Sequence, residues 1–244
     1  MKDKILFILG NGPSLGEIMN NDENLELLRQ HDTFGLNAAY RIYEKYNFYP
    51  TYFGCFDHVV NISHKNNFEN LVLSSNPIQK FFFIGSSDKR QNLYSSRVVS
   101  NSRFQKMNFI NRNIESFSRI STTFSNFVNM GSSGANAAQV GIVLGYKKIV
   151  LLGCDCNYVE KINGVKIVSG SKVELTRNLL DNPNYWFPEY QQKGDRFNVP
   201  QTDKFQMLSW RNLHRTCPKN VQIINGSFQS KIPFFSKQEF EKIF

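Results

Sequence analysis

Residues 4–14 read KILFILGNGPS, and this stretch decides the fold class. Lys4 to Leu9 is an apolar run of strand length that stops at a glycine, which is typical of a strand buried in a parallel sheet. Two glycines and a proline then predict a loop. Ser14 stands where it can cap a helix that starts near Leu15, and Glu17 has the spacing of a capping box. The order of these elements predicts the first unit of an α/β sheet.

Similar units recur along the chain. We expect further strands at 32–36, 51–56, 79–84, 148–152 and 221–224, and helices at 22–31, 38–45, 135–145 and 201–215. This alternation predicts an α/β fold with a Rossmann-like, mostly parallel sheet and helices on both faces. The 244 residues are expected to form a single domain. An irregular insert is predicted at about 86–128, and a lid-like segment at about 159–200.

Composition and charge exclude several classes of protein. No apolar run approaches the roughly 20 residues that span a bilayer, and a signal peptide needs a longer apolar region than the one after Lys2, so we expect a cytoplasmic protein. The formal net charge is +9, but the basic residues are scattered, which argues against a nucleic-acid partner. No His, Cys or Asp constellation has the spacing of a metal site.

Polar clusters follow several of the predicted strands. They are Gly10 to Ser14, Asn37, Asp57-His58 and Asp155 to Tyr158. In a parallel sheet these clusters converge on one edge, where ligands bind. Gly131 to Gly134 instead precedes a helix, and it is either a second cradle for an anion or sugar, or a plain helix cap.

The glycine loop favours a phosphate ligand. Glycine lets the backbone approach a phosphate closely, and the N–H groups at a helix N-terminus favour an anion. The loop lacks the third glycine of a dinucleotide fingerprint and the Gly-Lys-Ser/Thr of a Walker loop. The alternative interpretation is a tight turn between strand and helix.

Two further segments could carry chemistry. Asp57 or His58 could act as general base on an acceptor hydroxyl, or the pair forms an ordinary polar turn. Residues 185–200 hold an aromatic crowd with Asp195 and Arg196 among it. Such a loop could close over a ligand and exclude water, with Arg196 on a carboxylate or phosphate, or it is a surface loop pinned by its aromatic rings.

Four segments taken together resemble the bacterial sialyltransferases of glycosyltransferase family forty-two. These segments are Gly10 to Leu15, Gly131 to Gly134, Leu144 to Lys147 and Gly153 to Asp155. The chain is similar as well to the related motility accessory factor and pterin pyrophosphokinase-like proteins. The resemblance implies a Rossmann-like transferase fold, a GT-A-like variant, that uses a CMP-activated sugar acid without an obligatory metal or other cofactor.

The resemblance also implies roles for single residues. Asn11 would contact the donor phosphate or sugar, and Asn37 would lie near the cytidine and ribose. Ser133 would hold the sugar carboxylate, and Asp155 would lie by the nucleotide. The donor-binding residues that we expect are Gly10, Asn11, Gly12, Pro13, Ser14, Asn37, Ser132, Ser133, Gly134, Asp155 and Asn157.

The chain departs from the family pattern at the expected base. The sialyltransferases carry a histidine that aligns near Asn198, and an asparagine cannot take the proton. Either Asp57, His58 or Asp195 serves as base, or the donor and reaction differ. Met130 also stands in place of a family arginine. The candidate catalytic residues, with the tyrosines that could help a phosphate leave, are Asp57, His58, Asp195, Tyr158, Tyr185 and Tyr190.

The leading hypothesis is an inverting glycosyltransferase that moves a sialic acid-like or related sugar acid from CMP to a hydroxyl of a surface glycan, as in lipooligosaccharide or capsule biosynthesis. The alternatives are a pyrophosphokinase or other phosphoryl transferase, and a non-catalytic nucleotide-sugar binding protein. We expect a homo-oligomer. The C-terminal segment from Lys231 to Phe244 mixes phenylalanines with lysines, so it either rests on an anionic membrane surface or packs as a helix.

Overall fold

The computed structural model describes residues 2–84, 93–110, 120–159, 162–201 and 205–244. Its centre is one eight-stranded sheet with the order β13-β12-β8-β1-β2-β3-β4-β5, in which every neighbouring pair is parallel. The strands are β1 (Lys2–Leu9), β2 (Asp32–Leu36), β3 (Tyr52–Cys55), β4 (Lys80–Ile84), β5 (Phe104–Met107), β8 (Tyr146–Leu152), β12 (Gln222–Asn225) and β13 (Ser236–Lys237). The α/β prediction is confirmed.

The strand order reverses beside β1. From β1 the chain builds outward through β2, β3, β4 and β5, and it later returns to place β8 on the other side of β1. Such a reversal leaves a crevice beyond the carboxyl ends of the two diverging strands, which is where open α/β sheets bind ligands. The Gly10–Ser14 loop leaves the sheet at this reversal.

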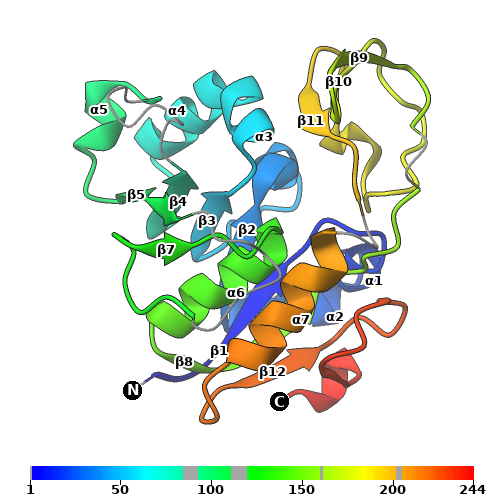
Figure 1. Ribbon diagram of the computed structural model, residues 1–244. Coiled ribbons are helices and arrows are strands. Elements are labelled where there is room, and N and C mark those ends of the chain that lie inside the picture. Colours follow the sequence, from blue (N-terminus) through cyan, green and yellow to red (C-terminus); the bar gives the residue numbers. More distant parts are fainter. Residues whose placement is uncertain (1, 85–92, 111–119, 160–161, 202–204) are drawn as a thin grey trace.

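Helices cover both faces of the sheet because its strands are apolar on both sides. Leu6 and Ile8 of β1 pack in one core with α6 (Ser133–Val143) and α7 (Met207–Thr216). Phe7 and Leu9 point to the opposite face, where α1 (Leu15–Met19) and α2 (Asp22–Arg29) cover them. Figure 1 shows α6 and α7 lying together across the front of the sheet. Along the same opposite face, η1 (Asn37–Ile42), α4 (Lys65–Leu73) and α5 (Ser96–Val99) cover β3 and β4.

The lid-like segment holds a second, small sheet. Strands β9 (Val165–Ser169), β10 (Lys172–Leu175) and β11 (Arg196–Asn198) pair antiparallel in the order β11-β10-β9. A two-residue turn at Gly170 and Ser171 joins β9 to β10, and Gly170 has a φ of +55°. The small sheet stands apart from the main sheet in Figure 1, and its β11 contacts α3 (His58–Ser63). Residues 160–161 of this segment lie outside the described residues.

Two local predictions differ from the structure, and the C-terminal segment agrees with one of its two interpretations. The helix expected at 38–45 is the shorter 3-10 helix η1. The insert at about 86–128 is less irregular than expected, because β5 extends the main sheet and β6 (Phe109–Ile110) pairs with β7 (Phe127–Val128). Its residues 86–92 and 111–119 lie outside the described residues. The C-terminal segment ends in a short 3-10 helix, η4 (Phe240–Lys242), whose Phe240 is buried together with Ile243.

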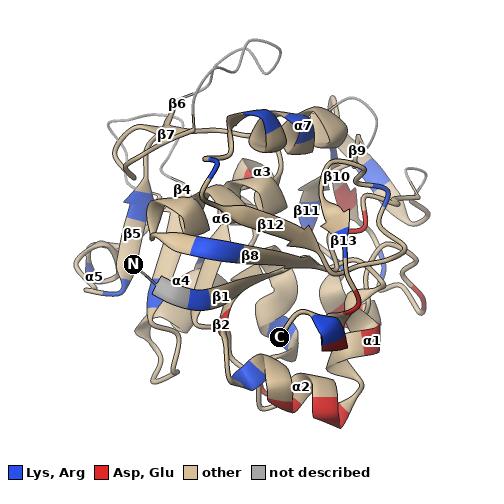
Figure 2. Cartoon of the chain, turned by 90° about the horizontal axis from the view of Figure 1, so that it is seen from below, with Lys and Arg blue, Asp and Glu red and all other residues tan. Residues whose placement is uncertain are grey.

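The charges of the protein are dispersed in the structure. Figure 2 shows Lys and Arg on separate elements of the viewed face, and Asp and Glu mainly near α1 and α2. Among the residues that the structure describes, no helix is long and apolar enough to cross a membrane.

Candidate active site

A cavity of about 440 Å³ lies beyond the carboxyl ends of β1, β2, β3 and β8, and β11 with the start of α6 closes its other sides. The cavity brings together many of the residues that the sequence predicts. The predicted residues that line it are Gly10, Asn11, Asn37, Asp57, Ser132, Ser133, Gly134, Tyr158, Tyr185, Tyr190 and Asp195. Those predicted residues that are not among the lining residues are Gly12, Pro13, Ser14, His58, Asp155 and Asn157.

The two glycines of the first loop are required by close packing against the loop after β8. The Gly10 N–H donates to Leu152 O (2.7 Å) and the Gly12 N–H to Gly153 O (2.9 Å). A Cβ on Gly10 would overlap the Gly153 carbonyl, and one on Gly12 would overlap the Asp155 carboxylate. The loops at the carboxyl ends of β1 and β8 are therefore locked together, and Gly10 reaches the cavity from this junction.

The capping-box prediction for Ser14 is wrong. Its side chain makes no cap hydrogen bond to α1. Instead the Ser14 hydroxyl donates to Asp155 Oδ1, and the Ser14 N–H donates to Asp155 Oδ2 (2.9 Å). Asp155 is buried, and both of its carboxylate oxygens accept hydrogen bonds from Ser14 of the first loop. Ser14 therefore bonds to a residue 141 positions away along the chain and does not cap α1. Asp155 is a support of the loop in this structure.

Asn11 and Asn37 bring unpartnered acceptor oxygens to the cavity. The Asn11 amide donates to Leu36 O (3.1 Å) and to the Tyr190 hydroxyl (3.2 Å), and the Asn37 amide donates to Ser133 Oγ (3.5 Å). The Oδ1 atoms of both asparagines are buried and, within the described part of the chain, have no hydrogen-bond partner. A buried acceptor left unpaired costs about 1–3 kcal/mol, so both oxygens favour a ligand that brings N–H or O–H groups.

The loop before α6 presents a helix N-terminus to the cavity. Asn129 Oδ1 accepts from the Gly131 N–H (2.9 Å), and Ser132 Oγ accepts from the Ala135 N–H (3.3 Å). These two bonds hold the turn in which Gly131 has a φ of +95°. Ser133 and Gly134 follow at the first turn of the helix, where free N–H groups and the helix dipole attract an anion.

Three tyrosines line the cavity, two from the lid-like segment and one just before it. Tyr185 and Tyr190 are stacked with their ring centroids 3.9 Å apart, and Tyr158 contributes a third hydroxyl. Burial raises the pKa of all three phenols, and the Asp57 charge raises the pKa of Tyr185 further. The hydroxyls therefore keep their protons at neutral pH and can donate hydrogen bonds to an anion.

Asp57 lines the cavity, and its carboxylate is held by several hydrogen bonds. Its Oδ1 caps α3 by accepting from the N–H groups of Val59 (2.8 Å) and Val60 (3.1 Å). The Asn198 amide donates to both oxygens, at 3.1 and 3.3 Å. His58 is the first residue of α3 and does not line the cavity, so of this pair it is the carboxylate that reaches the site.

Asp195 is engaged in an ion pair that leaves it poorly suited to take a proton. The Arg41 guanidinium donates to both of its oxygens, at 2.5 and 2.9 Å, and the Gln192 N–H donates to Oδ2 (2.7 Å). The Arg41 Nη1 also donates to Tyr190 O (2.8 Å). A bidentate Arg–carboxylate pair is strong and directional, so Asp195 anchors the small sheet to η1 and to Tyr190.

His64 lies in the wall of the cavity, although it belongs to none of the predicted polar clusters. Its Nδ1 faces the Tyr40 hydroxyl (2.9 Å) and its Nε2 faces Asp195 Oδ1 (3.5 Å). Burial lowers the pKa of His64 to about 4. Because the Asn67 amide donates to the Tyr40 hydroxyl, that hydroxyl can donate to Nδ1 and the Nε2 proton can face Asp195. A neutral histidine with both nitrogens occupied is a packed wall residue.

The described part of the chain contains no group of three or more His, Cys, Asp or Glu that could hold a metal ion. No protein-family model and no curated protein sequence matches the chain.

Solved structures do match. The MAf glycosyltransferase from Magnetospirillum magneticum AMB-1 aligns with a TM-score of 0.55 and 13% identity, over 99% of this chain and 34% of its own. The sialyltransferase CstII from Campylobacter jejuni, in complex with the substrate analogue CMP-3FNeuAc, aligns with a TM-score of 0.50 and 16% identity, over 99% of this chain and 89% of its own.

The fold is that of these glycosyltransferases. The resemblance drawn from the glycine loops is therefore confirmed at the level of the fold. The chain spans about a third of the length of the MAf glycosyltransferase. The cavity lies at the strand reversal, on the carboxyl edge of the sheet on which the sequence predicted that the polar clusters would converge, and part of each cluster lines it.

Proposed function

We propose that the protein is an inverting glycosyltransferase that moves a sugar acid from a CMP-activated donor to a hydroxyl of a glycan acceptor. The observation that supports the proposal is one cavity that joins the N-terminus of α6 and the unpaired oxygens of Asn11 and Asn37 to a carboxylate. Asn11 of the first loop, Ser133 at the start of α6 and Asp57 at the start of α3 all line this cavity. The likeness in fold to a sialyltransferase solved with a CMP-sugar analogue supports this choice of donor.

The donor is held by main-chain N–H groups and asparagine side chains. The phosphate lies at the N-terminus of α6, beside Ser133 and Gly134, where the helix dipole favours negative charge. The unpaired Oδ1 atoms of Asn11 and Asn37 accept from hydroxyl or amino groups of the nucleotide. Asp155 acts through the loop that it supports.

The tyrosine hydroxyls stabilise the leaving group. As the bond between the anomeric carbon and the phosphate oxygen breaks, its electron pair leaves with CMP and negative charge grows on that oxygen. The raised pKa of the Tyr158, Tyr185 and Tyr190 hydroxyls keeps them as donors for this charge.

Asp57 activates the acceptor. The acceptor oxygen forms the new bond to the anomeric carbon, and its proton passes to the Asp57 carboxylate. Asp57 is preferred over Asp195 because Arg41 and Gln192 already occupy both Asp195 oxygens. It is preferred over His58 because His58 is not among the residues that line the cavity.

Thermal shift measurements with CMP, UDP, GDP and ATP, each with Mg²⁺ or with EDTA, test the proposal. We expect stabilisation by CMP that survives EDTA, and release of CMP from a CMP-sugar acid in the presence of glycan acceptors. A shift with ATP that requires Mg²⁺ would favour a phosphoryl transferase instead. Stabilisation by CMP without turnover of any donor would leave a nucleotide-sugar binding protein.

A further inference from the structure

The two oxygens of the Asp57 carboxylate are not equivalent. Oδ1 accepts from the two N–H groups of α3 and from the Asn198 amide, so its lone pairs are in use. Among the described residues, Oδ2 accepts one hydrogen bond, from Asn198 Nδ2 at 3.1 Å. Because a carboxylate oxygen has two lone-pair directions, Oδ2 keeps one for a proton from a ligand. The reactive atom of Asp57 is therefore Oδ2.

The orientation of the Asn198 amide is fixed from both sides. Its Oδ1 accepts from the Ser171 hydroxyl at 3.2 Å, while its Nδ2 faces the carboxylate. The reverse orientation would place an oxygen against the negative charge of Asp57 and remove the acceptor of Ser171. Ser171, Asn198 and Asp57 form a directed chain of hydrogen bonds, and all three line the cavity.

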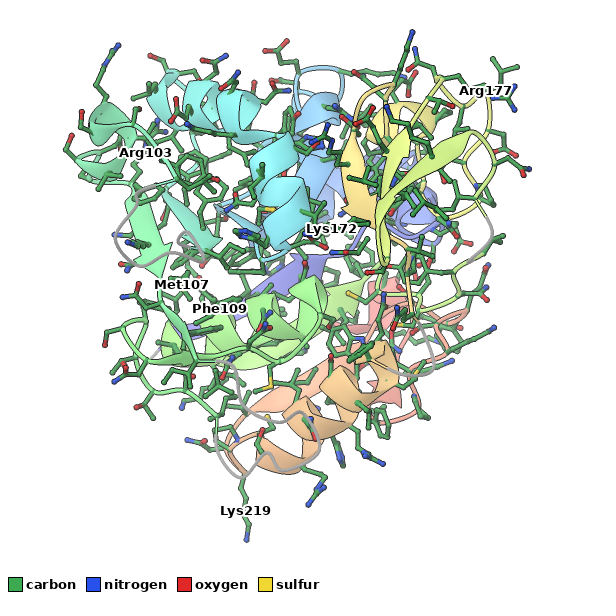
Figure 3. The ribbon with its side chains drawn as sticks, turned by 45° about the horizontal axis from the view of Figure 1, so that its top comes forward. Arg103, Met107, Phe109, Lys172, Arg177 and Lys219 are labelled. Atoms are coloured by element: carbon green, nitrogen blue, oxygen red, sulfur yellow. The ribbon has the colours of Figure 1, made fainter. Side chains whose placement is uncertain are left out.

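The position of Asn198 depends on how the small sheet docks against α3. Within the same stretch of chain, Asp195 pairs with Arg41, and the Arg196 N–H donates to Ser63 Oγ (2.9 Å) at the end of α3. Figure 1 shows β11 as the strand of the small sheet nearest α3, and Figure 3 shows Lys172, next to Ser171, toward the middle of the molecule with Arg177 at the outer end. These contacts fix the register at which Asn198 meets Asp57.

We propose that Asn198 is a positioning residue that orients the general base Asp57, with Ser171 orienting Asn198 in turn. The inference rests on the proposed function. The amide takes no proton; its hydrogen bonds stabilise the charged carboxylate and aim Oδ2 into the cavity. In the transfer step the acceptor proton moves to Oδ2, the acceptor oxygen bonds the anomeric carbon, and CMP leaves with the electron pair of the broken bond.

The test compares kcat, KM, CMP affinity and the pH profile of kcat/KM in Asn198→Leu and in the wild type. Leucine has the same branched side-chain skeleton as asparagine and donates no hydrogen bond. We expect kcat to fall about tenfold, the effect of losing one hydrogen bond to a charged group. The Kd for CMP should stay within about twofold, and the acid limb of the profile should move to higher pH, because the charged carboxylate has lost a donor.

Two further variants sharpen the result. Ser171→Ala should also lower kcat and move the acid limb to higher pH, but by less than Asn198→Leu does. The reason is that it removes the hydrogen bond that orients the Asn198 amide and leaves the amide itself in place. Asn66→Leu is the matched control, since Asn66 is exposed on α4 and does not line the cavity, and it should behave as the wild type.

The outcomes separate this inference from the proposed function. If kcat, CMP affinity and melting temperature all fall together while the acid limb stays in place, Asn198 merely holds the small sheet and the inference is wrong. Unchanged kinetics in Asn198→Leu would also overturn it, with the glycosyltransferase activity intact. A wild-type protein that binds CMP but transfers no sugar would overturn the proposed function, and the assignment of Asn198 with it.

Discussion

Replacing Asp57 by asparagine removes the proposed base but keeps the cap of α3, because Oδ1 stays an acceptor while Oδ2 becomes an N–H group. Asn and Asp are equally good N-caps, so the bonds to Val59 and Val60 persist. The lost charge at the start of α3 costs about 0.3–1 kcal/mol. The new N–H group faces Asn198 Nδ2 in place of the acceptor Oδ2, and the loss of that hydrogen bond costs about 0.5–3 kcal/mol more. The melting temperature should fall by about 2–4 °C for each kcal/mol in a chain of this size. The ability to take a proton is lost completely.

A positioned general base contributes about 10²–10⁴-fold to the rate, or roughly 3–5 kcal/mol. We therefore expect kcat/KM of Asp57→Asn to fall by at least a hundredfold while CMP still binds. Initial rates of CMP release, measured beside a thermal melt, give both quantities. Asp22→Asn, on the exposed first turn of α2, is the matched control.

A variant that retains more than a tenth of the wild-type kcat/KM would refute the assignment of Asp57. If the loss appears instead in His58→Ala, the imidazole is the base, and the structure of the free protein differs at this point from the complex. If both variants lose activity and their melting temperatures fall strongly, the substitutions have damaged α3. The loss of activity would then not support Asp57 as the base.

Three further predictions concern other parts of the site. Tyr185→Phe should lower kcat about tenfold with little change in KM for the donor, because the hydroxyl matters most as charge develops on the phosphate; steady-state kinetics measure this, and a change in KM alone would contradict it. Gly12→Ala should lower the free energy of unfolding by about 1–3 kcal/mol, because the new Cβ overlaps the Asp155 carboxylate; urea unfolding measures it, and unchanged stability would contradict the packing of the two loops. Burial lowers the pKa of His64 in the folded protein to about 4, whereas in the unfolded protein His64 binds a proton below about pH 6.5. Stability should then fall by on the order of 3 kcal/mol between about pH 6.5 and 4, and unfolding curves of His64→Gln should lose this part of the pH dependence; an identical pH dependence in the variant would refute the assignment.

The main sheet was predictable because its signals are local. Each central strand is an apolar run that stops at a turn residue, and burial on both faces makes the run continuous, as in residues 5–9. The glycine loop was recognisable for the same reason. The hairpin of β9 and β10 also had a local signal, since Gly170-Ser171 separates two short β-prone runs by two residues. This hairpin lies inside the segment that is predicted as a lid.

The pairings that complete the site had no local signal. Ser14 is a residue type that commonly caps helices. In the structure, however, its hydroxyl and its N–H both donate to the charged carboxylate of Asp155. Asn198 meets Asp57 across 141 residues, a contact that only the docking of the small sheet on α3 creates. Long-range pairs of this kind decide which carboxylate is free to react.

The most direct test of the account is a crystal structure of the protein with CMP. We predict that the phosphate lies in the cavity, within hydrogen-bond distance of main-chain N–H groups at the start of α6 and beside Asn11, with its open side toward Asp57. CMP bound elsewhere on the protein would contradict this prediction. So would CMP bound in the cavity with its phosphate turned away from both Asn11 and the start of α6.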